Sequence, residues 1–153
     1  MTFRPSTPKP RTSDGGHESA GDSTTETTAT YLRVLERISS AEGFASLLHP
    51  NVTLDARGTG HLWHCTTKKD VVDMARRAYH AGVRTEIFHS NLVGDRMMIF
   101  SRLRVPESVS EIVADGPVDG QRMYRVFTLR NGLIAHIRDC ADDKEALFTL
   151  LRS

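Results

Sequence analysis

The chain has 153 residues, of which 39% are hydrophobic and 25% charged, and its formal net charge is +1. This length and composition are typical of one globular domain, and the balanced charge gives no electrostatic reason to expect nucleic acid or an anionic membrane as a partner. No apolar run approaches the roughly 20 residues of a membrane-spanning helix, and we see no apolar segment typical of a secretion signal. With only two cysteines, Cys65 and Cys140, we expect free thiols and a cytoplasmic protein.

The N-terminal segment is rich in Thr, Ser, Pro and Gly and has almost no large apolar side chain. Such a segment buries too little surface to offset the entropy of ordering. We therefore expect a disordered tail over residues 1–27 and a folded domain over 28–153. The first helix is predicted to begin near Thr28 or Thr30, with an apolar face of Tyr31, Val34, Leu35 and Ile38.

Two further helices and two extended segments are predicted before residue 82. Ser40 can cap a short helix that ends at His49-Pro50, and residues 51–57 alternate as a strand does. Residues 61–65 are expected to form a short strand or an ordered loop. Thr67 can cap a helix that ends at Gly82, with Val71, Met74, Ala75, Ala78 and Tyr79 on one face.

The second half of the chain is predicted to be mainly strands. Residues 83–93 and 96–105 form two strands, residues 106–119 a loop or broken strand, and Asp142 can cap a last helix. Strands grouped after helices predict an α+β domain with an antiparallel sheet. Helices that cover one face of a curved sheet leave a conical cavity, which is a common ligand site.

The pair Asn131-Gly132 predicts a tight hairpin, because both residues tolerate the positive φ of a type I′ turn. A regular ladder then pairs Leu129 with Ile134 and Tyr124 with Asp139. Side chains alternate across a strand, so we expect one face to form a pocket wall. That face carries Tyr124, Val126, Thr128, Ala135, Ile137 and Asp139. The opposite face, with Met123, Arg125, Phe127 and His136, is expected to be an outer or interface face.

Over residues 28–150 the sequence resembles the nuclear transport factor 2-like superfamily, also called SnoaL-like or ketosteroid-isomerase-like. The resemblance lies in the paired N-terminal helices that run into 44–54 (FASLLHPNVTL), the 67–82 helix, the Gly94-Asp95 hairpin and 125–134 (RVFTLRNGLI). It implies a cone-shaped, curved antiparallel sheet covered by three helices from the N-terminal half, a cystatin-like α+β barrel. The family contains isomerases, cyclases, dehydratases, epoxide hydrolases and non-catalytic modules, so the resemblance implies a fold more than a function.

Some functional residues of the resembled family have approximate matches in this sequence. Ketosteroid isomerases have a carboxylate base after the first strand, where Asp55 is close and Ala56 takes the aligned place. Tyr31 lies about one turn out of step with their helix tyrosine, and Tyr124 stands roughly where they have a protonated Asp. Asp139 matches the catalytic Asp of SnoaL-like cyclases, with Ile137 and Arg138 in place of that family's His and Trp.

Asp139, Tyr124 and His64 are the candidate catalytic residues. A carboxylate in an apolar pocket has a raised pKa and suits general acid–base work. A nearby phenol could polarise a carbonyl or hold an enolate, with a histidine of the 61–64 stretch as a further hydrogen-bond partner. The alternative is structural: Asp139 forms a cross-strand hydrogen bond, or an ion pair with an arginine, that fixes the end of the sheet.

The candidate pocket-lining residues are Tyr31, Leu35, Asp55, His61, Trp63, Val126 and Ile137. His61, His64 and Cys65 could suggest zinc, but a catalytic zinc site needs three protein ligands, so we expect no metal. The alternative for this stretch is that Trp63 belongs to the core and the histidines to a solvated rim.

Two functions remain open. The first is a cofactor-independent isomerase, cyclase or dehydratase that transfers a proton on a small molecule, favoured by an Asp139 that reaches Tyr124 in a cavity. The second is a non-catalytic ligand-binding or dimerisation module, favoured by a salt-bridged Asp139. In either case we expect a homodimer through the open sheet face and no cofactor, nucleic acid or membrane partner.

Overall fold

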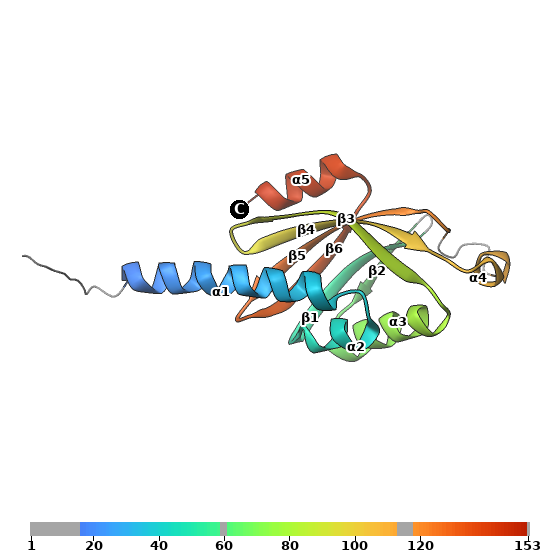
Figure 1. Ribbon diagram of the computed structural model, residues 1–153, viewed down its shortest axis with the longest axis horizontal. Coiled ribbons are helices and arrows are strands. Elements are labelled where there is room, and N and C mark those ends of the chain that lie inside the picture. The colour runs from blue at the N-terminus through green and yellow to red at the C-terminus, as the bar shows by residue number, and fades with distance from the viewer. Residues whose placement is uncertain (1–15, 59–60, 113–117, 153) are drawn as a thin grey trace, which may run out of the picture.

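The computed structural model describes residues 16–58, 61–112 and 118–152, apart from the side chains of 16–23, 57–58, 61–63 and 110–112. Figure 1 shows helices on both sides of one sheet. In chain order the elements are α1 (Gly16–Arg37), α2 (Ala41–Ser46), β1 (Leu48–Gly58), β2 (His61–Cys65), α3 (Lys68–His80), β3 (Arg84–Val93), β4 (Arg96–Arg104), α4 (Glu107–Ile112), β5 (Arg122–Arg130), β6 (Leu133–Cys140) and α5 (Asp143–Leu151).

The six strands form one curved, unclosed sheet in the order β2-β1-β6-β5-β4-β3. The predicted α+β architecture is therefore confirmed. Neighbouring strands are antiparallel except β1 and β6, which run parallel. The expectation of an antiparallel sheet thus fails at this one pair. No hairpin joins β1 to β6, since the chain crosses between the two halves of the sheet through α3, so their relative direction is not constrained by a turn.

The two faces of the sheet carry separate cores. We call inner the face that packs against α1, α2 and α3, and its core includes Val34, Phe44, Val71, Phe127 and Ile137. We call outer the face that packs against α5, and its core includes Met98, Phe100, Val126, Cys140 and Leu150. In Figure 1 α5 lies across the sheet from α2 and α3. The inner face therefore has the helical cover that a cavity requires.

Three helices begin at the caps that the sequence predicts. Ser40 Oγ accepts a hydrogen bond from Gly43 N at 3.0 Å, Thr67 Oγ1 accepts one from Asp70 N at 3.2 Å, and Asp142 Oδ1 accepts one from Glu145 N at 2.8 Å. Each bond satisfies a backbone N–H that has no partner within its own helix. Gly82 follows α3 with φ of +94°, as expected of a residue that ends a helix.

Two segments differ from expectation. The helix α1 begins at Gly16, so residues 16–27, which we expected within the tail, are helical. Residues 1–15 lie outside the described residues, and a boundary at residue 28 stays a prediction. The helix α4 occupies part of 106–119, where we expected a loop or broken strand. Pro106 comes directly before its first residue, and a fixed φ near −65° suits a helix start.

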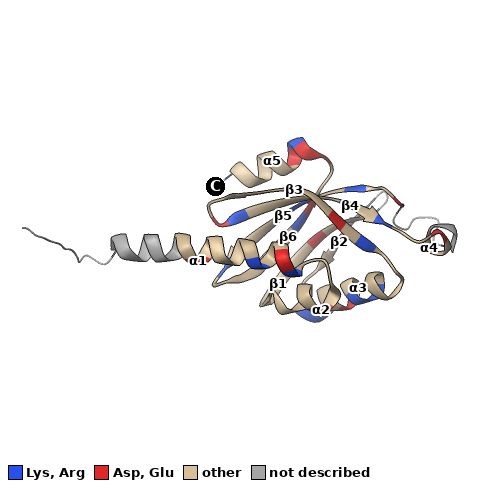
Figure 2. Cartoon of the chain, viewed as in Figure 1, with Lys and Arg blue, Asp and Glu red and all other residues tan. Residues whose placement is uncertain are grey.

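None of the described helices is both long and apolar enough to cross a membrane. Figure 2 shows acidic and basic residues interspersed along the described helices and strands rather than gathered on one of them.

Candidate functional site

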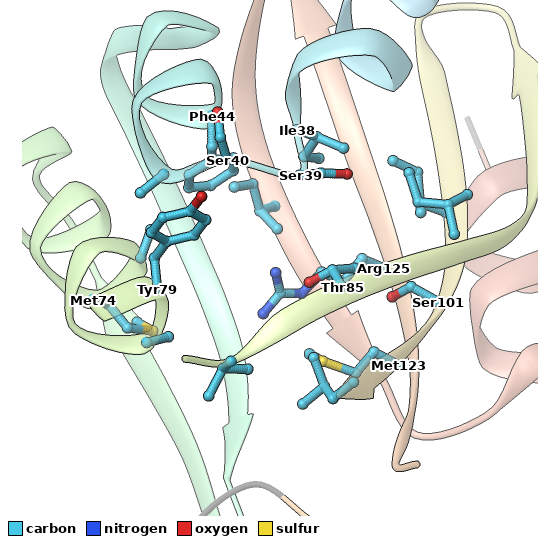
Figure 3. Close-up of a pocket in the computed structure, with 18 of the residues that line it drawn as sticks. Ile38, Ser39, Ser40, Phe44, Met74, Tyr79, Thr85, Ser101, Met123 and Arg125 are labelled. Carbon is cyan, nitrogen blue, oxygen red and sulfur yellow. The ribbon is translucent and has the colours of Figure 1, made fainter. Parts of the chain in front are cut away.

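A cavity of about 270 Å³ lies between the inner face of the sheet and the helices α2 and α3. Figure 3 shows its two walls, with Phe44, Met74 and Tyr79 on the helical side and Thr85, Ser101 and Arg125 on the strands. Most of the surface is apolar. The lining residues are Ile38, Ser39, Ser40, Ala41, Phe44, Leu54, Val71, Met74, Ala75, Ala78, Tyr79, Val83, Thr85, Ile87, Ile99, Ser101, Leu103, Met123, Arg125, Phe127 and Ile137.

The hairpin of β5 and β6 supplies the only charged group among these lining residues. Its turn is as predicted: Asn131 has φ of +53° and Gly132 of +79°, and Leu129 pairs with Ile134. Beyond that pair Ala135 is an extra residue in β6, a β-bulge, so that Thr128 pairs with His136. A bulge shifts the ladder by one residue, and every pair further from the turn differs from a regular register.

The shifted register places Arg125 opposite Asp139 and Tyr124 opposite Cys140. The predicted pairing of Tyr124 with Asp139 is therefore wrong. Tyr124 and Val126 belong to the outer core, where the Tyr124 ring meets Phe100 edge-on with centroids 4.9 Å apart. Neither residue lines the cavity. The prediction that Val126 lines the pocket and the prediction that the Tyr124 phenol lies beside Asp139 are therefore both corrected. Arg125 and Phe127, expected on the outer face, line the cavity instead.

Asp139 is buried, with 6% of its side chain exposed, and it accepts a hydrogen bond from Arg125 Nε. The side chain of Arg125 is 30% exposed and lines the cavity. Figure 3 shows its guanidinium reaching from the strands toward α3. Asp139 itself is not a lining residue, so the carboxylate stands behind the guanidinium. The salt-bridged arrangement, which the sequence left as an alternative, is the one observed.

Among the other predicted lining residues whose side chains the structure describes, only Ile137 lines the cavity. Tyr31 shares a hydrogen bond of 2.7 Å with Ser90 through its hydroxyl, and Leu35 packs against the inner core. Both residues fix α1 to the sheet but are not among those that line the cavity. The side chains of His61 and Trp63 lie outside the described part of the structure.

Asp55 and His64, two further candidates, lie on the outer face. His64 Nδ1 is 2.5 Å from Asp55 Oδ1, and the side chain of His64 is 76% exposed. The second carboxylate oxygen of Asp55 lies 3.4 Å from Nε2 of His136, whose Nδ1 is 2.6 Å from Thr53 Oγ1. Asp55 as a lining residue is corrected, because β1 turns Leu54 and not Asp55 toward the cavity. His64 lies beside Asp55 and not beside Asp139, so its catalytic role stays a prediction without support from this geometry.

The described residues contain no group of three or more His, Cys, Asp or Glu side chains placed to hold a metal ion. Cys65 and Cys140 are free thiols.

Sequence reasoning missed Arg125, Ser101 and Thr85 as cavity residues. The face of α3 was a usable signal, since the apolar residues predicted to share it (Val71, Met74, Ala75, Ala78 and Tyr79) all line the cavity. Arg125 alternates with Met123 and Phe127, which is the pattern of an inward-facing strand interrupted by one charge.

No protein-family model and no curated protein matches this sequence. Solved structures do match. TerC, co-crystallised with polyporic acid, has a TM-score of 0.57 and 18% identity over 84% of this chain and 99% of TerC. An NTF2-like protein of unknown function from Burkholderia pseudomallei has a TM-score of 0.56 and 17% identity over 84% of this chain and 98% of its own. An LEH-like epoxide hydrolase from M. tuberculosis has a TM-score of 0.52 and 17% identity over 84% and 91% of the two chains.

Identities this low carry the fold and no shared activity. The match covers 84% of this chain in each of the three, so what the chain shares with them is the arrangement of its helices and strands. The chain therefore has the nuclear transport factor 2-like fold, which confirms the resemblance at the level of architecture.

Proposed function

We propose that the cavity binds a small, largely apolar molecule through an oxygen atom held by Arg125. The observation that carries this proposal is the Arg125–Asp139 pair, which places one guanidinium in a mostly apolar lining. Apolar walls with a few polar groups that orient the ligand are typical of small-molecule sites. A guanidinium forms its strongest hydrogen bonds with carboxylates and other oxyanions, so the ligand is expected to carry a carboxylate or an acidic enol.

Catalysis by proton transfer is the second candidate. The observation that favours it is a buried carboxylate, Asp139, bonded to Arg125, which lines the cavity. In this candidate Arg125 stabilises the enolate oxygen, and Asp139 takes a proton from carbon and returns it to another atom of the same molecule. Isomerisation, cyclisation and dehydration of this kind need no cofactor. Binding ranks first because the ion pair engages Asp139 and places it behind Arg125.

Calorimetric titration with 2-naphthoate and its neutral counterpart 2-naphthamide tests the binding proposal. We expect saturable binding of the acid, weakened about tenfold or more in Arg125→Met, because a charge-assisted hydrogen bond is lost. The amide should change little. Arg125→Met leaves Asp139 buried without its guanidinium partner, so the double variant Arg125→Met/Asp139→Asn serves as a second variant that restores charge balance. Polyporic acid, which was crystallised with TerC, is a second probe. Equal affinity of wild type and both variants for the acid would refute the proposal.

The same proteins test the catalytic candidate with 2-tetralone, an apolar ketone with acidic α-hydrogens. Exchange of those hydrogens in D₂O, followed by NMR, should be faster with wild type than with Asp139→Asn or Arg125→Met. If 2-tetralone binds but its hydrogens exchange no faster than without the protein, the catalytic candidate is refuted and ligand binding is the remaining function.

We also propose that the protein is a cytoplasmic homodimer. Two free cysteines fit a reducing compartment. On the outer side α5 leaves Leu147, Phe148 and Leu151 exposed, and β3 leaves Phe88 exposed under the guanidinium of Arg122. Aromatic side chains and arginines are enriched at protein interfaces. We therefore propose that the dimer interface includes the exposed side of α5 in addition to the open sheet face that the sequence suggested.

A further inference from the structure

Ser101 of β4 is a buried hydroxyl on the cavity wall. Only 4% of the residue is exposed, and none of the hydrogen bonds found among the described residues involves its side chain. The other buried polar residues are bonded: Thr30 Oγ1 donates to Glu26 O at 2.9 Å, and Asp139 pairs with Arg125. Ser101 Oγ is not one of the fully enclosed side-chain atoms that lack a partner. Because Ser101 lines the cavity, a ligand or a water molecule there can satisfy its hydroxyl.

The other hydroxyls of the lining are in different positions. Ser40 Oγ already accepts the Gly43 N–H as the cap of α2. Ser39 is exposed, so water can satisfy it, and Thr85 and Tyr79 are only partly buried. Among the described lining residues, Ser101 therefore combines burial with an unused hydroxyl.

The strand register places Ser101 near Arg125 on the same face. Ser101 pairs with Met123, and Arg125 pairs with Ile99, so the two are diagonal neighbours on β4 and β5. Diagonal neighbours of an antiparallel pair lie roughly 7 Å apart. Figure 3 shows Ser101, Met123 and Arg125 on the strand side of the cavity. One ligand can therefore reach both polar groups across a short apolar span.

We propose that Ser101 is a second ligand anchor, and that the ligand is a rigid apolar acid with a second, uncharged oxygen. Arg125 binds the acidic oxygen, and Ser101 exchanges a hydrogen bond with a hydroxyl or carbonyl oxygen of the same molecule. This inference rests on the proposed binding function and specifies its ligand class: aromatic or polycyclic hydroxy-acids and oxo-acids.

A set of related probes separates the two anchors. Calorimetry compares 2-naphthoate with 3-, 6- and 7-hydroxy-2-naphthoate on wild type, Ser101→Ala and the control Ser108→Ala, because Ser108 is exposed on α4 and is not among the lining residues. We expect at least one hydroxynaphthoate to bind wild type and Ser108→Ala about fivefold more tightly than 2-naphthoate, as one net hydrogen bond implies. Ser101→Ala should lose this gain and keep the affinity for 2-naphthoate.

The unliganded protein gives a second measurement. If Ser101 serves only the ligand, Ser101→Ala should leave the urea midpoint of unfolding unchanged or higher, whereas a structural hydrogen bond would lower it. A hydroxyl gain that survives in Ser101→Ala, or no gain for any isomer, overturns the role of Ser101 while Arg125-dependent binding of 2-naphthoate stands. If 2-naphthoate does not bind, both the binding function and this inference are overturned.

Discussion

A guanidinium bonded through Nε to a carboxylate cannot rotate freely about its last side-chain bonds, and this decides what Arg125 offers to a ligand. Asp139 holds it from β6 while the rest of the group faces an apolar space. A lysine at this position has no planar set of donors, so it could not bind Asp139 and the ligand in one plane as arginine can. Asp139 is therefore a positioning residue in the binding proposal, and it acts on substrate only in the catalytic candidate.

The thiol of Cys140 gives a pH dependence that can be measured. Cys140 is buried beneath α5 in the outer core, and burial raises its pKa from 9.0 to about 11. The folded state thus favours the neutral thiol, whereas the unfolded chain forms thiolate from about pH 9. Stability from this group is complete below pH 9 and is lost as the pH rises toward 11.

We expect wild type to lose about 1 kcal/mol of unfolding free energy from this group between pH 8 and pH 10. Urea titrations of wild type and Cys140→Ala at both pH values measure it, since the lysines and tyrosines of the two proteins are the same. Cys140→Ala should be less stable at pH 8 because it leaves a cavity, and its loss on going to pH 10 should be smaller. Equal losses would show that Cys140 titrates as an exposed thiol.

At the scale of elements, the β5–β6 hairpin shows what local sequence can and cannot predict. The Asn131-Gly132 turn and its first two pairs were predictable, because positive φ is a local property of those two residues. The bulge at Ala135 was not, because Ile134, Ala135 and Ile137 are all apolar and do not reveal which of them is extra. One unrecognised residue exchanged the faces of β5 and moved the expected site from Tyr124 to Arg125.

Helix starts were predicted better than strand faces for a physical reason. A cap is a bond between residues three apart, and Ser40, Thr67 and Asp142 each form it as expected. A strand face is chosen by its partners in the sheet, which come from distant parts of the sequence. Asp55 illustrates this: its alternation with Leu54 was visible, but the side that meets the helices was not.

The turn itself yields a stability prediction. Gly132 has φ of +79°, and a Cβ there would lie 3.5 Å from Arg33 Nη2, an ordinary contact. The cost of Gly132→Ala therefore comes from the backbone, and we expect a loss of about 1 kcal/mol in urea unfolding. Asn131→Gly keeps the positive φ of that position accessible and should change stability by much less. A neutral Gly132→Ala would mean that the turn adopts another type.

At the scale of the whole molecule, the cavity arises only when distant segments close on each other. Its walls come from the α1–α2 link, from α2, α3 and from five of the strands, β1 and β3–β6. The grouping of helices before strands predicted this architecture and the presence of a cavity. The identity of its one charged residue depended on the register of a single strand pair, which explains why the fold was predictable and the site was not.

The proposed dimer makes the last prediction. Phe148 and Leu151 are 64% and 67% exposed on α5, and their spacing of three residues places them on one side of that helix. Large apolar side chains grouped in this way are typical of an interaction surface. If they meet a second copy, Phe148→Asp/Leu151→Asp should convert a dimer to the single-chain mass of 17.0 kDa in sedimentation equilibrium. Leu32→Asp is the matched control, because Leu32 is 59% exposed on α1, which packs on the inner face, and it should leave the dimer intact. A wild type that sediments as one chain, or a loss of dimer with Leu32→Asp alone, would contradict an interface through α5.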